Sequence, residues 1–148
     1  MPHHSNTWLQ RIKDIEREHQ SVRFAIRRLL AEADRDPTVL EGTLRVRDLR
    51  LASEHLDGTY IIRLFAEFET GLRLFWATLR DTEPRTRDLL DGIAARKRIP
   101  PEKLQSAHDV REYRNFLIHE REEKITSIGV AAARSSLCRF FSHLPPTW

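Results

Sequence analysis

Apolar residues recur every three or four positions along most of this sequence, and this spacing limits the chain to helical folds. From Thr7 to about Arg35 the repeat comprises Trp8, Ile12, Ile15, His19, Val22, Ile26, Leu29 and Ala33. Such a repeat predicts one long helix with a single apolar stripe. Asn6 is its expected N-cap and Asp36, before Pro37, its expected end. The stripe can pack on the helix's own bundle or against its copy in a dimer, and the sequence leaves both open.

The rest of the chain has the same helical character. The spacing predicts a helix or a pair of helices over residues 45–80, with a possible break at Asp57-Gly58, and further helices over 86–97, 102–119 and 126–143. Pro101 can open the helix over 102–119 at its first position, and the charged residues 120–124 are expected to form a turn. We therefore predict an all-α fold. Residues 45–148 would form a four-helix bundle core, and residues 1–44, a helix and a connector, would pack on that core or in a dimer.

Composition excludes several other classes of protein. Five glycines and seven prolines in 148 residues are too few for an all-β fold with many tight turns, and one cysteine allows neither an intramolecular disulfide nor a zinc site of several cysteines. No apolar run approaches the roughly 18 residues of a membrane span, and the N-terminus lacks the pattern of a secretory signal. These features predict a cytoplasmic protein with no membrane partner. The net charge of +3 is compatible with a polyanionic partner but too small to establish one.

The helix expected over residues 102–119 carries an unusual polar face. A helical wheel places Arg111, Arg114, Asn115 and His119 together, with Ile118 among them, and assigns Val110, Tyr113, Phe116 and Leu117 to the buried face. Two arginines and a histidine suit an oxyanion such as a phosphate group. The apolar residue in their midst predicts that a second copy of the helix covers this face at a dimer interface. As a bare spacing, Arg and His at a helix end can also arise by chance or favour the helix dipole.

The segment Arg114-Asn-Phe-Leu-Ile-His119 resembles the R-x4-6-H motif of the HEPN superfamily, in its Arg-Asn-x-x-x-His form. Residues 107–113, which lead into the motif, are similar to the usual HEPN helix. Residues 64–72 resemble the acidic, apolar helix that opens the HEPN core, and residues 140–145 fit its closing helix. The resemblance covers about residues 45 to 145. It implies a HEPN-type four-helix bundle acting as a homodimeric, metal-independent endoribonuclease without a cofactor, often a toxin or antiphage effector.

The resemblance also implies roles for individual residues. His119 would act as the general acid and base, and Arg114 would bind the scissile phosphate and stabilise charge in the transition state. Asn115 would orient either of them, and Glu69 would match the acidic residue on the first core helix. Arg111 is added from the helical wheel alone, as a substrate-binding residue. RNA would be the substrate, and cleavage by its own 2′-hydroxyl would leave a 2′,3′-cyclic phosphate and a 5′-hydroxyl.

Two other interpretations stay open. The same fold could be an inactive module that binds a nucleotide, RNA or a partner protein, or the chain could be a helical regulator or antitoxin with an accidental Arg–His spacing. Some HEPN toxins carry a tyrosine two residues after the motif histidine, which a partner nucleotidyltransferase modifies. This chain has Arg121 there, so an antitoxin or regulatory protein of another kind, or none, is compatible with the sequence.

A compact basic cluster, Arg96-Lys97-Arg98, stands beside the Pro100-Pro101 turn. Charge runs of this kind are commonly solvated helix ends. In a ribonuclease this cluster would be the best candidate for binding the RNA backbone outside the active site. We predict Arg96, Lys97 and Arg98 as accessory substrate-binding residues on that basis. No Gly-rich phosphate loop, nucleophile elbow or zinc signature is present, and no metal ligands are predicted.

Overall fold

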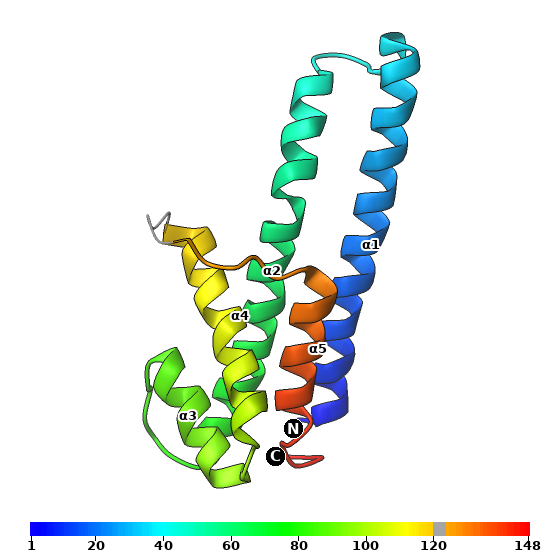
Figure 1. Cartoon of the computed structure of the whole chain (residues 1–148). Helices are drawn as coiled ribbons and strands as arrows, with labels where there is room; N and C mark the ends of the chain where they lie inside the picture. Colours follow the sequence, from blue (N-terminus) through cyan, green and yellow to red (C-terminus); the bar gives the residue numbers. More distant parts are fainter. Residues whose placement is uncertain (120–123) are drawn as a thin grey trace.

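The computed structural model describes residues 1–119 and 124–148, and in this part of the chain helices are joined by short non-helical connections (Figure 1). The elements are α1 (Ser5–Arg35), the 3-10 turn η1 (Pro37–Val39), α2 (Val46–Ala77), α3 (Thr86–Lys97), α4 (Pro101–His119) and α5 (Val130–Phe141). The described residues form no β-strand, and their one isolated bridge joins His4 to Thr147 near the two termini. The all-α prediction is confirmed. None of the described helices is both long enough and apolar enough to cross a membrane.

The two long helices, α1 and α2, run side by side along the molecule (Figure 1). The first half of α1 also packs against α5, and its residues Trp8, Ile12 and Ile15 are buried in the same hydrophobic core as side chains of α2 to α5. The first half of the apolar stripe of α1 therefore packs within the chain. The second half of α1 and the first half of α2 extend beyond α4 and α5 as a two-helix arm.

The core lies where α1, α2, α4 and α5 meet. Its largest fully buried side chains are Phe65, Phe68 and Phe75 of α2 and Phe140 and Phe141 of α5. Phe68 lies edge-on to Phe140, with ring centroids 5.6 Å apart. The short α3 packs against α2 and α4 at the opposite end of the molecule from the arm (Figure 1). This packing sets α2 between α1 and α4 and determines which side chains of α4 face inward.

The predicted break at Asp57-Gly58 is absent, because α2 is continuous through both residues. Asp57 accepts a hydrogen bond from His19 of α1, with 2.7 Å between Oδ1 and Nε2. A Cβ atom on Gly58 would lie 3.3 Å from the Leu117 side chain of α4, so Leu117 packs beside this glycine. These tertiary contacts offset the cost of a glycine in a helix interior, about 1 kcal/mol relative to alanine.

The two ends of α3 and the start of α4 agree with the sequence prediction. The helix α3 has the predicted bounds, and α4 begins at Pro101. By contrast, α1 begins at Ser5 with His4 as N-cap, so Asn6 is not the cap. Backbone hydrogen bonds between His3 and Trp148, of 2.8 and 3.0 Å, hold the chain before α1 against the C-terminus. The predicted turn at 120–124 falls largely outside the described residues, as does Arg121.

Two glycines of α2 should respond oppositely to alanine substitution. A Cβ on Gly71 would lie 2.8 Å from the buried Phe141 ring and 3.1 Å from Trp8, so Gly71→Ala is expected to lower the free energy of unfolding by about 1–3 kcal/mol through overpacking. Gly58→Ala meets only the flexible end of Leu117 and should raise it by about 0.5–1 kcal/mol. Urea unfolding of both variants tests this, and equal effects at the two positions would contradict it.

Candidate active site

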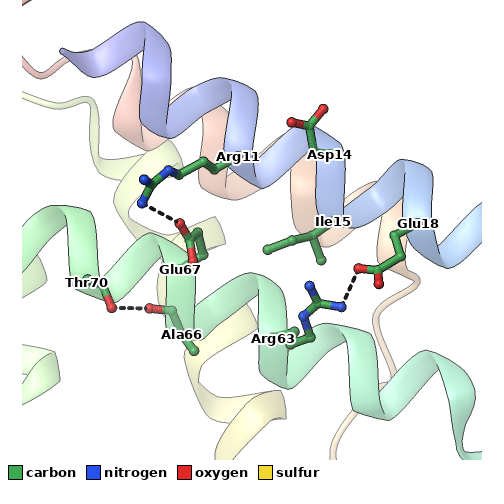
Figure 2. A pocket seen from close by; sticks show the side chains of 8 residues that line it. All are labelled: Arg11, Asp14, Ile15, Glu18, Arg63, Ala66, Glu67 and Thr70. Carbon is green, nitrogen blue, oxygen red and sulfur yellow. Dashed lines mark hydrogen bonds and ion pairs between the residues drawn. The ribbon is translucent and has the colours of Figure 1, made fainter.

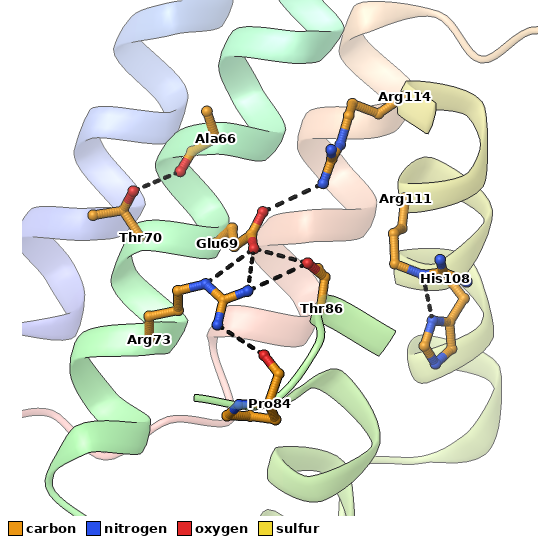
Figure 3. A network of polar contacts seen from close by, with 9 residues as sticks. All are labelled: Ala66, Glu69, Thr70, Arg73, Pro84, Thr86, His108, Arg111 and Arg114. Carbon is orange, nitrogen blue, oxygen red and sulfur yellow. Dashed lines mark hydrogen bonds and ion pairs between the residues drawn. The ribbon is translucent and has the colours of Figure 1, made fainter. Parts of the chain in front are cut away.

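A polar cluster joins three helices around the carboxylate of Glu69 on α2 (Figure 3). Glu69 Oε1 accepts hydrogen bonds from Arg73 Nη2 at 2.6 Å, Arg73 Nε at 3.0 Å and Thr86 Oγ1 at 2.8 Å. Glu69 Oε2 accepts from Arg114 Nη2 at 3.3 Å, so the same carboxylate also holds the motif arginine of α4. Arg73 additionally donates to the carbonyl of Pro84 at 3.0 Å. One acidic residue therefore fixes two arginines and the start of α3.

Arg114 is largely enclosed between α4 and α2. Its guanidinium carbon lies 4.6 Å from the centroid of the Phe65 ring, and 19% of its side chain is exposed. No described residue accepts a hydrogen bond from its buried Nε. Burial lowers the pKa of the Arg114 guanidinium and Arg111 lowers it further, whereas Glu69 opposes both. Arginine nevertheless stays charged at neutral pH, so the side chain is a fixed cation whose Nε donor has no described partner.

The orientation of Arg114 corrects the helical-wheel prediction, which placed it on the face away from the core. The inward side of α4 is centred on the buried Ala107 and Val110, and Arg114 continues that row. Phe116, assigned to the buried face, is only half-buried and stacks on Tyr113 with ring centroids 6.4 Å apart. An arginine can occupy an inward position here because Glu69 supplies a counter-charge and Phe65 an aromatic surface.

Asn115, Ile118 and His119 occupy the end of α4 beyond this cluster. Asn115 is half-buried, whereas His119 is the last residue of the helix and is exposed. Ile118 is 45% exposed. The hydrogen bonds between described residues include none from the side chains of Asn115 or His119. Along the helix axis, His119 lies about 7.5 Å beyond Arg114. Within one chain, Arg114 is hydrogen-bonded to Glu69, whereas no described contact joins His119 to either residue.

Arg111 takes part in a second cluster that the sequence patterns did not reveal. Its Nε donates to His108 Nδ1 at 3.2 Å, and His108 Nε2 lies 2.7 Å from Asp91 Oδ1 on α3. Arg111 also pairs with Glu112, and its side chain is only 13% exposed. These residues line a cavity between α3 and α4. The spacing of His108 and Arg111 places them on one side of α4, but only the tertiary packing brings Asp91 to them.

The basic cluster Arg96-Lys97-Arg98 is not brought to the Glu69–Arg114 pair. It lies at the C-terminal end of α3, about 16 Å along the helix from Thr86. Arg96 lies 5.6 Å from the Trp76 ring centroid and Lys97 5.4 Å from that of Phe75. Arg98 has a left-handed backbone (φ 50°) and ends the helix. Two of these three cations therefore cover aromatic rings of α2 and contribute to packing.

Comparisons of this chain with protein-family models, with curated proteins and with solved structures found no significant match. In the part of the chain that the structure describes, no group of three or more His, Cys, Asp and Glu side chains is placed to hold a metal ion.

Proposed function

We propose that this protein is a homodimeric, metal-independent endoribonuclease of the HEPN type, and that it acts as a toxin or antiphage effector. The observation that carries the proposal is the ion pair between Glu69 and Arg114. It couples the arginine of the motif to the acidic residue that the HEPN resemblance names on another helix, 45 positions away. An accidental Arg–His spacing would give no reason for this coupling.

The proposed chemistry needs only groups that α4 and the RNA supply. The 2′-hydroxyl of the RNA attacks the adjacent phosphorus and passes its proton to a neutral His119. The bond from phosphorus to the 5′-oxygen breaks, and that oxygen takes a proton from a protonated His119 of the second copy. Histidine serves both roles because its ordinary pKa, about 6.5, lies close to neutral pH. The products are a 2′,3′-cyclic phosphate and a 5′-hydroxyl.

Arg114 would stabilise the negative charge that builds up on the non-bridging oxygens of the phosphate. Glu69 and Phe65 already hold its guanidinium, so little reorganisation is needed when that charge develops. The Nε donor is buried and has no described partner, so an RNA phosphate would contact the exposed part of the side chain, of which 19% is accessible. Asn115, one position further along α4, would orient the phosphate or the histidine.

A second copy completes the site in this proposal. One chain offers a single His119 at the exposed end of α4, whereas the reaction uses both a base and an acid. The exposed Ile118 lies next to it and favours a twofold contact between two α4 helices. Such a contact would bring both histidines and both arginines to one cleft.

The test is RNA cleavage by the purified protein in EDTA, with end-group analysis of the products. We expect cyclic phosphate ends from the wild type and a loss of about 10²–10⁴-fold in rate for His119→Ala. His55→Ala, which removes another exposed histidine, is the matched control and should cleave normally. His119 is exposed, so its replacement should leave the melting temperature unchanged.

Two results would contradict the proposal. Cleavage that persists in His119→Ala would place the activity elsewhere. A folded wild-type dimer that binds RNA, cleaves none, and does not arrest growth when expressed would instead support the inactive binding module, which shares the fold and the charged face.

A further inference from the structure

A large aromatic side chain is exposed on the outer side of α1. Phe24 is 67% exposed, although the neighbouring positions Val22 and Ile26 are half-buried against the rest of the molecule. At 100° per residue, Arg17, Arg27 and Arg28 all lie within about 60° of Phe24, and Arg23 borders it. All four arginines are exposed. We call Phe24 and these four arginines the α1 surface.

Most of the positive charge of the α1 surface has no acidic partner. Arg28 pairs with Glu32 at 3.3 Å, but no described acidic residue lies within ion-pair distance of Arg17, Arg23 or Arg27. On the side of α1 that faces α2 the arrangement differs. There Arg11 pairs with Glu67 at 3.4 Å and Arg63 with Glu18, across the cavity between the two helices (Figure 2). The inner side of α1 thus carries cations paired across to α2, whereas three of the four arginines around Phe24 have no acidic partner among the described residues.

An aromatic ring among unpaired arginines suits a ligand that has both negative charge and flat apolar faces. A single-stranded nucleic acid has both, because its phosphates attract arginine and its bases stack on aromatic rings. A twofold contact between two copies of this surface would set arginines against arginines, which disfavours a second copy. A membrane surface would need a broad apolar face, and in α1, all of which is described, Phe24 is the one large hydrophobic residue that is exposed.

We propose that the α1 surface binds a single-stranded nucleic acid, with a base stacked on Phe24 and phosphates held by Arg17, Arg27 and Arg28. From Arg17 to Arg28 the arginines span about 16 Å of helix, enough to contact several nucleotides. The surface lies on α1, whereas the Glu69–Arg114 pair joins α2 and α4, and α1 and α4 flank α2 on different sides (Figure 1). The binding proposed here is therefore independent of cleavage.

The experiment measures fluorescence anisotropy of a labelled 20-nucleotide poly(U) RNA in EDTA, with every variant built in the His119→Ala background so that the probe stays intact. Phe24→Ala should weaken binding by about 5- to 150-fold, the range seen when one stacking aromatic is lost. Arg17→Gln/Arg27→Gln should weaken it and lower the slope of log K against log salt by about 1 to 2. Arg80→Gln/Arg139→Gln removes two other exposed arginines and is the matched control, for which we expect the parent affinity.

Phe24→Tyr distinguishes stacking from mere apolar contact and should bind like the parent, whereas Phe24→Leu should bind like Phe24→Ala. The inference is overturned if the control pair loses as much affinity as the Arg17/Arg27 pair, or if Phe24→Ala binds unchanged. It is also overturned if the same substitutions abolish binding to phosphatidylserine vesicles and leave RNA binding intact. Because cleavage is not measured, neither the success nor the failure of this test depends on the ribonuclease proposal.

Discussion

Replacement of Arg114 with lysine is expected to lower RNA cleavage by about 10²–10³-fold, although the positive charge is kept. The guanidinium donates to Glu69 through Nη2, lies over the Phe65 ring and keeps part of its surface exposed for a phosphate oxygen. A lysine ammonium is a single point of charge and cannot make these three contacts at once. Single-turnover cleavage of a defined RNA, wild type beside Arg114→Lys, measures the effect.

Unfolding measurements on variants of Glu69 and Arg114 test the ion pair between these residues without any assay of cleavage. Glu69→Ala leaves Arg73 and Arg114 without their shared carboxylate, so we expect a loss of about 1–3 kcal/mol in the free energy of unfolding. Because 40% of the Arg73 side chain is exposed, solvent screening keeps the loss near the lower end of that range. In a double-mutant cycle, Glu69→Ala and Arg114→Ala should couple by about 0.5–3 kcal/mol.

Arg87→Ala is the control for that cycle, since Arg87 is an exposed arginine of α3 outside the Glu69 cluster. Its effect should add to that of Glu69→Ala within experimental error. If the effects of Glu69→Ala and Arg114→Ala on the free energy of unfolding are also additive, Glu69 does not hold Arg114 in the way proposed. Full cleavage by Arg114→Lys would remove Arg114 as the phosphate-binding residue, whatever the stability data show.

Mixing wild-type and His119→Ala chains is expected to reduce activity as the square of the wild-type fraction. If one His119 acts as base and the other as acid, a dimer with a single His119 is inactive. Co-refolded equal amounts should then give about one quarter of the wild-type rate, against one half if each chain works alone. Rates measured across a series of mixing ratios separate a quadratic from a linear dependence.

Ile118→Asp tests the contact itself. Burying an unpaired charge is costly, so this variant should dissociate the dimer and lose cleavage while it remains folded. Leu44→Asp, which changes another exposed apolar residue, is the control and should stay dimeric. A wild type that is already monomeric in analytical ultracentrifugation, or a linear mixing curve, would contradict the composite site.

The cluster around Glu69 and the cluster of Asp91, His108 and Arg111 differ in how far the sequence could predict them. Glu69 and Arg114 were named together through a family resemblance, and the structure brings them within 3.3 Å. The resemblance cannot say that Arg73 and Thr86 share the same carboxylate, because these contacts depend on where α3 begins relative to α2. Asp91 and His108 had no sequence signal at all, since a histidine and an aspartate 17 positions apart on separate helices form no motif.

What the sequence by itself determined is local. Apolar spacing every three or four residues made the chain helical, and Pro101 opened α4 at its first position, because proline has a backbone fixed near the helical value and lacks the N–H that a first turn leaves unpaired. The tertiary structure decided which side of each helix faces inward. Arg114 points toward α2 because Glu69 and Phe65 neutralise and cover it, and α2 continues through Gly58 because Leu117 fills the space. The spacing of a sequence sets the helix, whereas orientation depends on the charge and shape of neighbours that are distant in the chain.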